Sequence, residues 1–378
     1  MSQINIRNLS NENDDGAPDI VGISTFSAIS YVVPPVGTTL QRPENPQGGD
    51  LRFNTDTASL EYFRGDAIGW SQIEMTSPDL NGGARAIAFG GNNGSAYTDI
   101  EYFTISTLGD AIDFGDFATA RNAAASCASR TRGIVATGQE PGTVTADIDY
   151  VTISSTGGST DFGGDVTDSR DFSAGLSNQI RGIFGGGRIS NPSTAGNVID
   201  YITIASGGDA VDFGDTRNTS LWYPMLLASQ TRGIFGSGKD GSENSDIDFI
   251  TISTTGNAVE FGDLNTNHGG VGVSNSTRGL FAGGYNPGLC NKITYITIAT
   301  TGNTTTFGDL TRDARGLAAA SSRTRACFIG GKSPANSNVI DYVQIATEAT
   351  ALDFGDLAQS NNGEKGNVAA CSNAHGGL

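Results

Sequence analysis

The chain has little of several features that define common protein classes. Only 16% of its 378 residues are charged, and it has four cysteines, two histidines and eleven prolines. No apolar run approaches the roughly 20 residues that a helix needs to span a bilayer, so we expect no membrane insertion. The opening MSQINIRNLSNENDD lacks the apolar segment of a secretory signal. The cysteines are too far apart in sequence for a zinc-type pair, and we expect four buried free thiols.

Positive charge is also scarce. The chain carries 22 Lys and Arg against 40 Asp and Glu, a net charge of −18, so we expect no nucleic-acid partner. Glycine is abundant at 53 residues but has no every-third-residue period, which excludes a collagen-like chain. Glycine and asparagine accept positive φ, so this composition favours short strands joined by many tight turns.

A repeat accounts for most of the sequence. Six copies of one segment follow one another at intervals of 46 to 51 residues, which suits propeller blades and exceeds leucine-rich or ankyrin repeats. The copies are RAIAFGG at Arg85, RGIVATG at Arg132, RGIFGGG at Arg181, RGIFGSG at Arg232, RGLFAGG at Arg278 and RACFIGG at Arg325.

Three further elements follow the same order in every repeat. One alternates apolar and polar residues, as in VIDYITIAS; the next is of the type AVDFGD; the last is rich in small residues, as in ARNAAASCAS. Period-two alternation with short polar turns predicts strands and hairpins. Four strands per repeat predict an all-β chain folded as a six-bladed β-propeller. The last small-residue element precedes residue 378, so we expect it to lie beside the first repeat and close the ring.

The repeat also carries a charged pair. Each Arg that opens a copy is followed by the Asp of an FGD-type segment, and these could form charge-assisted hydrogen bonds. We interpret them as structural pairs within or between blades; the alternative is a ligand-binding ring at the central channel. The pairs are Arg85 and Asp116, Arg132 and Asp165, Arg181 and Asp215, Arg232 and Asp263, Arg278 and Asp309, and Arg325 and Asp356.

Specificity is expected in the loops that differ between repeats, because variable loops on a repeated scaffold often form the binding face. The candidate ligand-binding residues are Tyr97, Arg188, Lys239, Tyr285 and Lys332. Trp222 and Tyr223 are further aromatic candidates, for which core packing is the alternative. Aspartate pairs at Asp147/Asp149 and Asp246/Asp248 would suit calcium, but they do not recur in every repeat. We predict no catalytic residue, no metal site and no cofactor.

The first 80 residues lack the repeat. We divide the chain into an extended anchor and linker over residues 1–48, a small β-meander over 49–80 and the propeller over 81–378. The Pro- and Gly-rich composition of residues 34–48 is typical of a linker. Two alternating runs, LRFN and LEYF, predict the meander, which ends near Trp70.

The segments GDLRFNTDTASLEYFRG and TRGIFGGG…VIDYITIA…DFGD resemble the N-terminal β-module and the kelch-like repeats of virion structural proteins, of the tail-fibre or appendage type, from tailed phages that infect marine bacteria such as cyanobacteria. The resemblance covers about residues 49–378. It implies a virion protein that is assembled in the host cytoplasm. Residues 1–48 would dock onto other virion proteins, and a homotrimer would form through the N-terminal region. The propeller would bind a host-surface glycan or protein.

Two alternatives remain open at this point. The first is a capsid decoration or head-fibre protein, which would need the same anchor and exposed module. The second is a carbohydrate-active propeller enzyme that uses scattered carboxylates.

Overall fold

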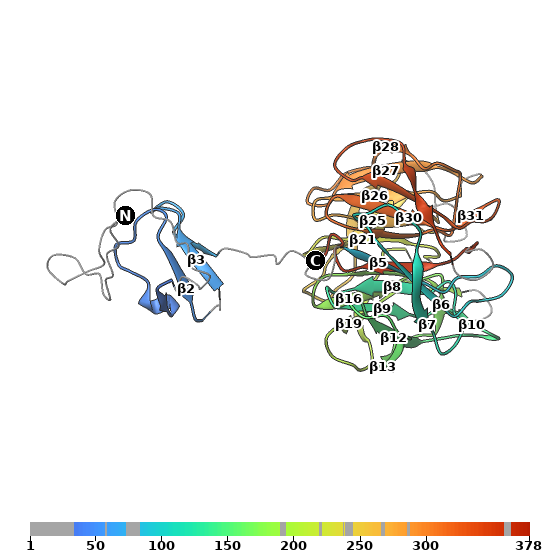
Figure 1. Cartoon of the computed structure of the whole chain (residues 1–378), viewed down its shortest axis with the longest axis horizontal. Helices are drawn as coiled ribbons and strands as arrows, with labels where there is room; N and C mark the ends of the chain where they lie inside the picture. The colour runs from blue at the N-terminus through green and yellow to red at the C-terminus, as the bar shows by residue number, and fades with distance from the viewer. Residues whose placement is uncertain are drawn as a thin grey trace, which may run out of the picture. The chain divides into compact units, whose positions relative to one another are not determined.

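The computed structural model describes residues 34–56, 59–72, 84–189, 194–218, 221–236, 238, 245–265, 269–285, 288–358 and 364–378. The chain divides into two compact units, Met1–Ser77 and Pro78–Leu378 (Figure 1). The described residues form strands and one short 3-10 helix, and most strands belong to four-stranded antiparallel sheets. The all-β prediction is therefore confirmed.

The first unit is one four-stranded sheet. Its elements are β1 (Val36–Gly37), η1 (Thr39–Gln41), β2 (Leu51–Asn54), β3 (Ser59–Phe63) and β4 (Trp70–Gln72). Strands β2, β3 and β4 form an antiparallel meander, and β1 pairs in parallel with β2. The prediction of a linker over 34–48 is therefore wrong, because the Pro- and Gly-rich stretch supplies an edge strand and a helical turn to the sheet. Residues 1–33 lie outside the described part.

A buried carboxylate organises this sheet. Glu61 on β3 has no exposed side-chain surface and accepts hydrogen bonds from Arg42, Arg52 and Asn54. The two guanidinium nitrogens lie 2.6 and 2.7 Å from its oxygens. Hydrogen bonding from Arg42 is the largest cause that lowers the pKa of Glu61 from 4.5 to about 2, and burial opposes it.

We expect the first unit to lose stability in acid because of Glu61. The pKa of this carboxyl is lower in the folded state, so its contribution is complete above pH 4.5 and disappears as the pH falls toward 2. The contribution is on the order of 3 kcal/mol. Trp70 fluorescence in a Trp222→Phe chain, followed through urea unfolding at several pH values, measures it. A Glu61→Gln chain should be less stable at pH 7 and lose this pH dependence; an unchanged slope in Glu61→Gln would contradict the assignment.

The second unit contains six four-stranded antiparallel sheets among its described residues, here numbered 1 to 6 in repeat order. Sheet 1 is β35 (Ala369–Ser372), β5 (Arg85–Phe89), β6 (Asp99–Thr104) and β7 (Ile112–Asp116). Sheet 2 is β8 (Ala125–Ala128), β9 (Arg132–Ala136), β12 (Asp147–Thr152) and β13 (Thr160–Asp165). Sheet 3 is β15 (Ala174–Ser177), β16 (Arg181–Gly185), β19 (Val198–Thr203) and β20 (Val211–Asp215).

The other three sheets have the same order. Sheet 4 is β21 (Met225–Ala228), β22 (Arg232–Gly236), β23 (Asp246–Thr251) and β24 (Val259–Asp263). Sheet 5 is β25 (Val271–Ser274), β26 (Arg278–Ala282), β27 (Lys292–Thr297) and β28 (Thr305–Asp309). Sheet 6 is β29 (Ala318–Ser321), β30 (Arg325–Ile329), β33 (Val339–Gln344) and β34 (Leu352–Asp356). In each sheet the small-residue strand is the first strand and the FGD-type strand is the fourth.

Among the described residues, seven further short strands lie in the loops and segments that connect the strands of the six sheets. They are β10 (Gln139–Glu140), β11 (Thr143–Val144), β14 (Arg170–Asp171), β17 (Arg188–Ile189), β18 (Thr194–Ala195), β31 (Lys332–Ser333) and β32 (Ala335–Asn336). Strands β10 and β11, β17 and β18, and β31 and β32 form antiparallel hairpins between the second and third strands of their repeats.

The first strands of the sheets contact one another. Strand β8 contacts β15, β15 contacts β21, β21 contacts β25, β25 contacts β29, β29 contacts β35 and β35 contacts β8. Serine hydroxyls bridge them, as where Ser372 donates to the Ser321 carbonyl at 2.6 Å. Sheet 1 takes its first strand, β35, from the C-terminal end of the repeat array, whereas its other three strands come from the first repeat.

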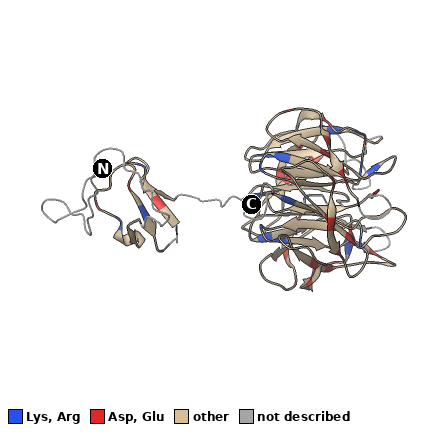
Figure 2. Cartoon of the chain, in the orientation of Figure 1, with Lys and Arg blue, Asp and Glu red and all other residues tan. Residues whose placement is uncertain are grey.

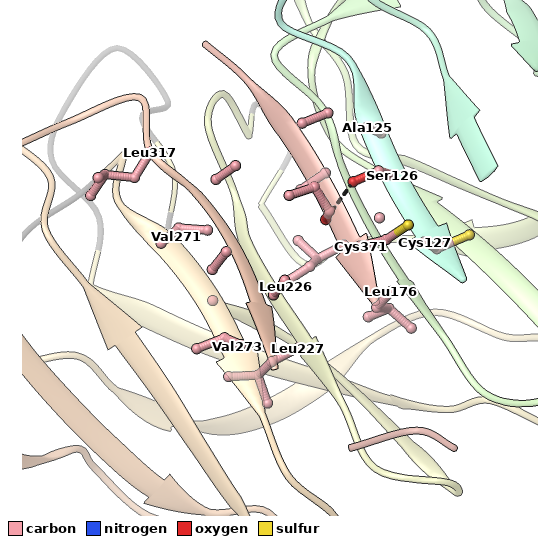
Figure 3. Close-up of a pocket in the computed structure, with 18 of the residues that line it drawn as sticks. Ala125, Ser126, Cys127, Leu176, Leu226, Leu227, Val271, Val273, Leu317 and Cys371 are labelled. Carbon is pink, nitrogen blue, oxygen red and sulfur yellow. Dashed lines mark hydrogen bonds between the residues drawn. The ribbon is translucent and has the colours of Figure 1, made fainter. Parts of the chain in front are cut away.

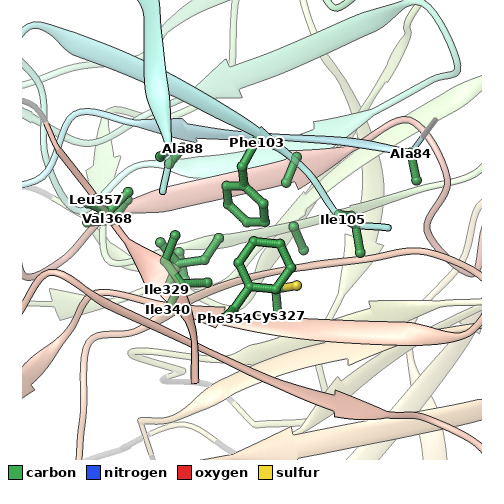
Figure 4. Packing of buried hydrophobic residues seen from close by; sticks show 14 residues of the cluster. Ala84, Ala88, Phe103, Ile105, Cys327, Ile329, Ile340, Phe354, Leu357 and Val368 are labelled. Carbon is green, nitrogen blue, oxygen red and sulfur yellow. The ribbon is translucent and has the colours of Figure 1, made fainter. Parts of the chain in front are cut away.

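Buried hydrophobic residues lie in clusters between successive sheets. The cluster between sheets 6 and 1 joins Phe103, whose ring centroid lies 5.0 Å from that of Phe354, to Ile329, Ile340 and Cys327 (Figure 4). Corresponding clusters join sheets 1 and 2, 2 and 3, 3 and 4, 4 and 5, and 5 and 6. Each sheet thus buries its faces against its neighbours, which explains why the unit repeats.

The second strands carry glycine where a neighbouring sheet approaches closely. A Cβ atom on Gly185 would lie 2.3 Å from Phe235 of sheet 4, and one on Gly236 would lie 2.5 Å from Phe281 of sheet 5. The aromatic ring of one sheet therefore occupies the space that a side chain on the preceding sheet would need.

The fourth strands form the exposed edges of the sheets. Each pairs with its third strand through a β-bulge, for example between Ile199 and Asp200. In four of the six described strands the first residue is an exposed apolar side chain, as at Val211 and Leu352, and an acidic residue follows each of these two, Asp212 and Asp353. Acidic residues are spread over the unit (Figure 2).

Of the four cysteines, Cys127, Cys327 and Cys371 are buried, as expected, and Cys290 is partly exposed. Cys290 lies in the loop between the second and third strands of sheet 5. Its thiol accepts a hydrogen bond from the backbone amide of Lys292. Its loop position explains why it is not buried like the other three, which lie in strands.

Candidate functional site

Two kinds of connection meet at one end of the sheets. The loops that join second to third strands bond through their backbones to the segments that lead from a fourth strand to the next first strand. Examples are the bonds between Gln139 and Asn122, between Lys332 and Arg315, and from Gly187 to Leu221. This loop end therefore gathers the variable segments of the sequence around the start of the first strands.

The structure does not join the Arg and Asp that recur in each repeat. In sheet 3 Arg181 lies opposite Thr203 and Asp215 lies opposite Val198, so the two occupy opposite ends of the sheet. Ion pairs among the described residues include none of the expected pairs. The prediction of this partnership is therefore wrong for Arg132 and Asp165, Arg181 and Asp215, Arg232 and Asp263, Arg278 and Asp309, Arg325 and Asp356, and Arg85 and Asp116.

These arginines instead connect neighbouring sheets. Each guanidinium stacks on the aromatic ring of its own third strand, as Arg132 does on Tyr150 at 4.6 Å. The same Nη1 donates to the Ile204 carbonyl of the next sheet at 3.0 Å. Arg325 of sheet 6 donates to Ile105 of sheet 1 at 2.7 Å. The role is structural, and a backbone carbonyl takes the place of the predicted carboxylate.

Replacing Arg278 by methionine should lower the free energy of unfolding by about 1–2 kcal/mol. The change removes the bonds to Ile345 and Ala346 and the stacking on Tyr295 at 4.3 Å, while it keeps an apolar stem. Urea unfolding measures the loss. Arg323→Met, in an exposed turn, is the control for the lost charge and should change stability by less than about 0.5 kcal/mol. Equal losses in the two variants would contradict a bridging role.

The fourth-strand Asp residues bond near their own ends of the sheets. Asp116 accepts a hydrogen bond from Thr98, and Asp309 accepts one from Lys292 at 2.7 Å. The backbone amides of Asp215 and Asp263 donate hydrogen bonds to the side-chain oxygens of Asn257 and Asn303, which belong to the next sheet in each case. The recurring Asp thus stabilises the loop end of its sheet and its junction with the neighbour.

A different set of ion pairs is buried at the loop end. Arg170 and Asp200 have no exposed side-chain surface and lie 2.6 Å apart. Arg312 contacts Asp341 at 2.7 Å, and Lys365 contacts Glu101 at the same distance. Arg121 bonds Glu140 and Asp149, and Arg217 bonds Asp248. Apart from the contact of Arg121 with Glu140, which lies on β10, each pair joins a cation from the segment before a first strand to a carboxylate on a third strand.

Burial is the largest cause of the pKa shift at five residues of these pairs, whereas hydrogen bonding to Asp248 raises the pKa of Arg217. Burial lowers the pKa of Arg170 and Arg312, and it raises the pKa of Asp149, Asp248 and Asp341, although the paired charges oppose each shift. The second aspartates of both proposed calcium pairs, Asp149 and Asp248, are thus occupied by arginines. Within the described ranges no group of three or more His, Cys, Asp or Glu residues could hold a metal ion.

Four of the five predicted ligand-binding residues belong to the described loops. Tyr285 is 49% exposed and stacks with the guanidinium of Arg315 at 5.3 Å. Arg188 bonds Asp171 and lies over the rings of Phe172 and Trp222.

The other predicted loop residues are less closely grouped. The ring of Tyr97 lies 5.6 Å from the ammonium of Lys365, and Lys332 is exposed on β31. Lys239 falls outside the described residues. The structure thus brings Arg188 together with Trp222, and Tyr285 together with Arg315, which was not predicted.

The first strands enclose a cavity of about 160 Å³. Small and aliphatic residues line it, including Ala125, Leu226 and Val273, and the Ser126 hydroxyl donates to the Ala370 carbonyl at 2.7 Å (Figure 3). Phe172 and Tyr223 line its loop end.

Residues 375–378 pack at the other end of the first strands. The His375 imidazole contacts Ser177 and the Ala128 carbonyl, and the Gly376 amide donates to Ser274. Leu378 is buried. This segment therefore crosses from sheet 1 to sheets 2, 3 and 5 at the end of the first strands away from the loops.

Comparison with protein-family models and with curated protein sequences gives no match. In the described part of the chain no helix has the length and apolar character required to cross a membrane.

Proposed function

We propose that this protein is a virion structural protein of a tailed phage, a tail fibre or similar appendage without catalytic activity. In this proposal sheets 1 to 6 are the blades of a closed, six-bladed, kelch-like β-propeller. The first-strand contacts that run from β8 to β35 and return to β8 support closure, as does the cluster between sheets 6 and 1. A closed ring leaves no blade with an unpaired first strand.

One observation carries the binding role: segments that differ in every repeat gather at one end of a scaffold that does not differ. The loop hairpins β10–β11, β17–β18 and β31–β32 all bond to the segments that precede first strands. Variable loops on a constant scaffold suit recognition of a host-surface glycan or protein. The first unit, a separate compact body, is the candidate anchor to other virion proteins, and a trimer would form through it.

Gold-labelled Fab fragments against the purified protein, imaged on phage particles, test the location. Fab fragments are preferable to a tag at residue 378, because residues 375–378 pack on the first strands. Label around the tail is the expected result, with particles that lack the chain as the control.

Other labelling results would change the proposal. Label over the shell would make the protein a capsid decoration or head-fibre protein, and the absence of label would overturn the virion role. Cleavage of a host polysaccharide by the purified protein would favour the enzyme alternative.

A further inference from the structure

The start of every first strand has the same left-handed backbone. Two residues before each of these strands φ lies between 51° and 68°. The residues are Ala123, Phe172, Tyr223, Gly269, Gly316 and Asn367. Only two of the six are glycine, the residue that adopts this conformation without strain.

Hydrogen bonds between sheets explain the backbone conformation. The amide of Tyr223 donates to the Phe172 carbonyl at 3.1 Å, that of Phe172 to Ala123 at 2.9 Å and that of Ala123 to Asn367 at 3.0 Å. The Asn367 amide continues the series to Gly316 at 3.0 Å. This series of bonds fixes φ, and it would form equally well with glycine.

The aromatic side chains at Phe172 and Tyr223 are therefore not required by the backbone. A bulky residue in the left-handed region is strained, because its Cβ atom lies too close to the following carbonyl oxygen. Strain of this kind concentrates at ligand-binding sites, where the side chain has a use that offsets its cost. The two strained aromatic residues are adjacent in the ring, and their ring centroids lie 4.3 Å apart.

The aromatic pair lies at the mouth of the cavity. Phe172 and Tyr223 line its loop end, and Gly316, which contributes no side chain, lines the mouth as well. The volume of about 160 Å³ is below the roughly 300 Å³ of pockets for drug-sized ligands. The mouth therefore suits one small ring that can stack on an aromatic face.

Positive charge accompanies the aromatic pair. The guanidinium of Arg188 is already engaged by Asp171. Arg315 is exposed, precedes Gly316 in the chain and has no carboxylate partner among the described residues. Gly316 lines the mouth, so the preceding Arg315 lies at its rim, where it stacks with Tyr285. Burial raises the pKa of Tyr223 to about 12; the charge of Arg315 opposes this shift, and the carboxylate of Asp171 adds to it. Tyr223 therefore keeps its hydroxyl proton, and Arg315 can bind an anion.

We propose that Phe172, Tyr223 and Arg315 form a binding site for an acidic saccharide. The ring of the sugar stacks on the aromatic pair, and its carboxylate accepts hydrogen bonds from Arg315. The Tyr223 hydroxyl and the side-chain amide of Asn367, which also lines the cavity, can form hydrogen bonds with the sugar hydroxyls. The chain as a whole carries a net charge of −18 and repels anions. Arg315 therefore makes this mouth a place where an acidic sugar is favoured over a neutral one. The inference specifies the ligand class for the surface-binding role proposed above and rests on it.

Binding of oligosaccharides to the purified full-length chain tests the site. The probes are a glucuronic-acid-containing oligosaccharide and the glucose oligosaccharide of the same length, titrated by calorimetry. We expect the acidic probe to bind at least fivefold more tightly. Phe172→Gly with Tyr223→Gly should weaken its binding at least tenfold. Glycine suits the backbone at both positions, so the variant is expected to fold, which circular dichroism verifies.

Matched variants isolate each part of the site. Ala123→Gly relieves the same strain at an equivalent position without removing an aromatic ring, and should leave affinity within twofold. Arg315→Gln should abolish the preference for the acidic probe, whereas Arg323→Gln, with the same loss of charge in an exposed turn, should not.

Three results would overturn the proposal. They are the absence of binding to either probe at millimolar concentration, unchanged affinity in the double glycine variant, and an unchanged acidic preference in Arg315→Gln. Because purified protein is used, the outcome is independent of the Fab labelling of particles: loss of sugar binding leaves a virion location intact, and absence of label leaves measured sugar binding intact.

Discussion

Replacing Arg170 by methionine is expected to reduce the free energy of unfolding of the second unit by about 3–5 kcal/mol. The change leaves the carboxylate of Asp200 buried with only the Thr167 hydroxyl as a described side-chain partner. Both members of the pair have no exposed side-chain surface, so water cannot replace the lost guanidinium. Guanidinium chloride unfolding monitored by Trp222 fluorescence measures the effect.

Two variants separate the cost of an unpaired charge from the value of the pair. Arg170→Met combined with Asp200→Leu removes both charges and should recover most of the lost stability. Arg217→Met breaks the equivalent pair with Asp248, where the arginine side chain is 39% exposed, and should cost about 1 kcal/mol. If Arg170→Met were no more costly than Arg217→Met, burial would not determine the strength of these pairs.

Deletion of residues 369–378 is expected to abolish cooperative folding of the second unit. Strand β35 pairs with β5 from Ala369 opposite Phe89 to Ser372 opposite Ala86, and its side chains contribute to the clusters on both sides of sheet 1. The loss is comparable with the whole stability of a domain, about 5–15 kcal/mol. Calorimetry of the full and deleted chains measures it.

A shorter deletion and a peptide provide the controls. Removal of residues 374–378 leaves β35 in place and should lower the melting temperature without abolishing the transition. A peptide of residues 364–378 added to the deleted chain should restore a cooperative transition by re-forming the β35–β5 pairing. If the long deletion had the same melting temperature as the full chain, the proposed closure of the ring through β35 would be refuted.

The strand pattern could be predicted from the sequence because it depends on local periodicity. In the third strand of sheet 3 Ile199 and Tyr201 alternate with Asp200, which is the period of a strand, and the structure has the strand there. The repeat also identified which residues recur, such as Arg181 and Asp215. It could not identify their contacts, because spacing along the chain does not state which end of a sheet each residue occupies.

The buried ion pairs gave only a partial signal in the repeat. Arg121, Arg170 and Lys365 each lie two residues before the left-handed position of their repeat, whereas Arg217 and Arg312 lie six and four residues before theirs. A long side chain can reach a third-strand carboxylate from several positions along the preceding segment. Arg217 and Arg312 therefore keep the ion pair although they do not occupy the same repeat position as the other cations. The strained backbone at Phe172 and Tyr223 was equally hidden, because neither residue type indicates positive φ.

The acidic fourth strands have a consequence for neighbouring copies of the protein. An exposed strand edge is a template for pairing with another chain, and apolar residues such as Val211 and Leu352 would strengthen such pairing. The adjacent Asp212 and Asp353 place like charges on any two edges that meet, and the bulges interrupt their register. Many copies can therefore be crowded at high local concentration without joining edge to edge, and salt or acid that weakens this repulsion would promote aggregation.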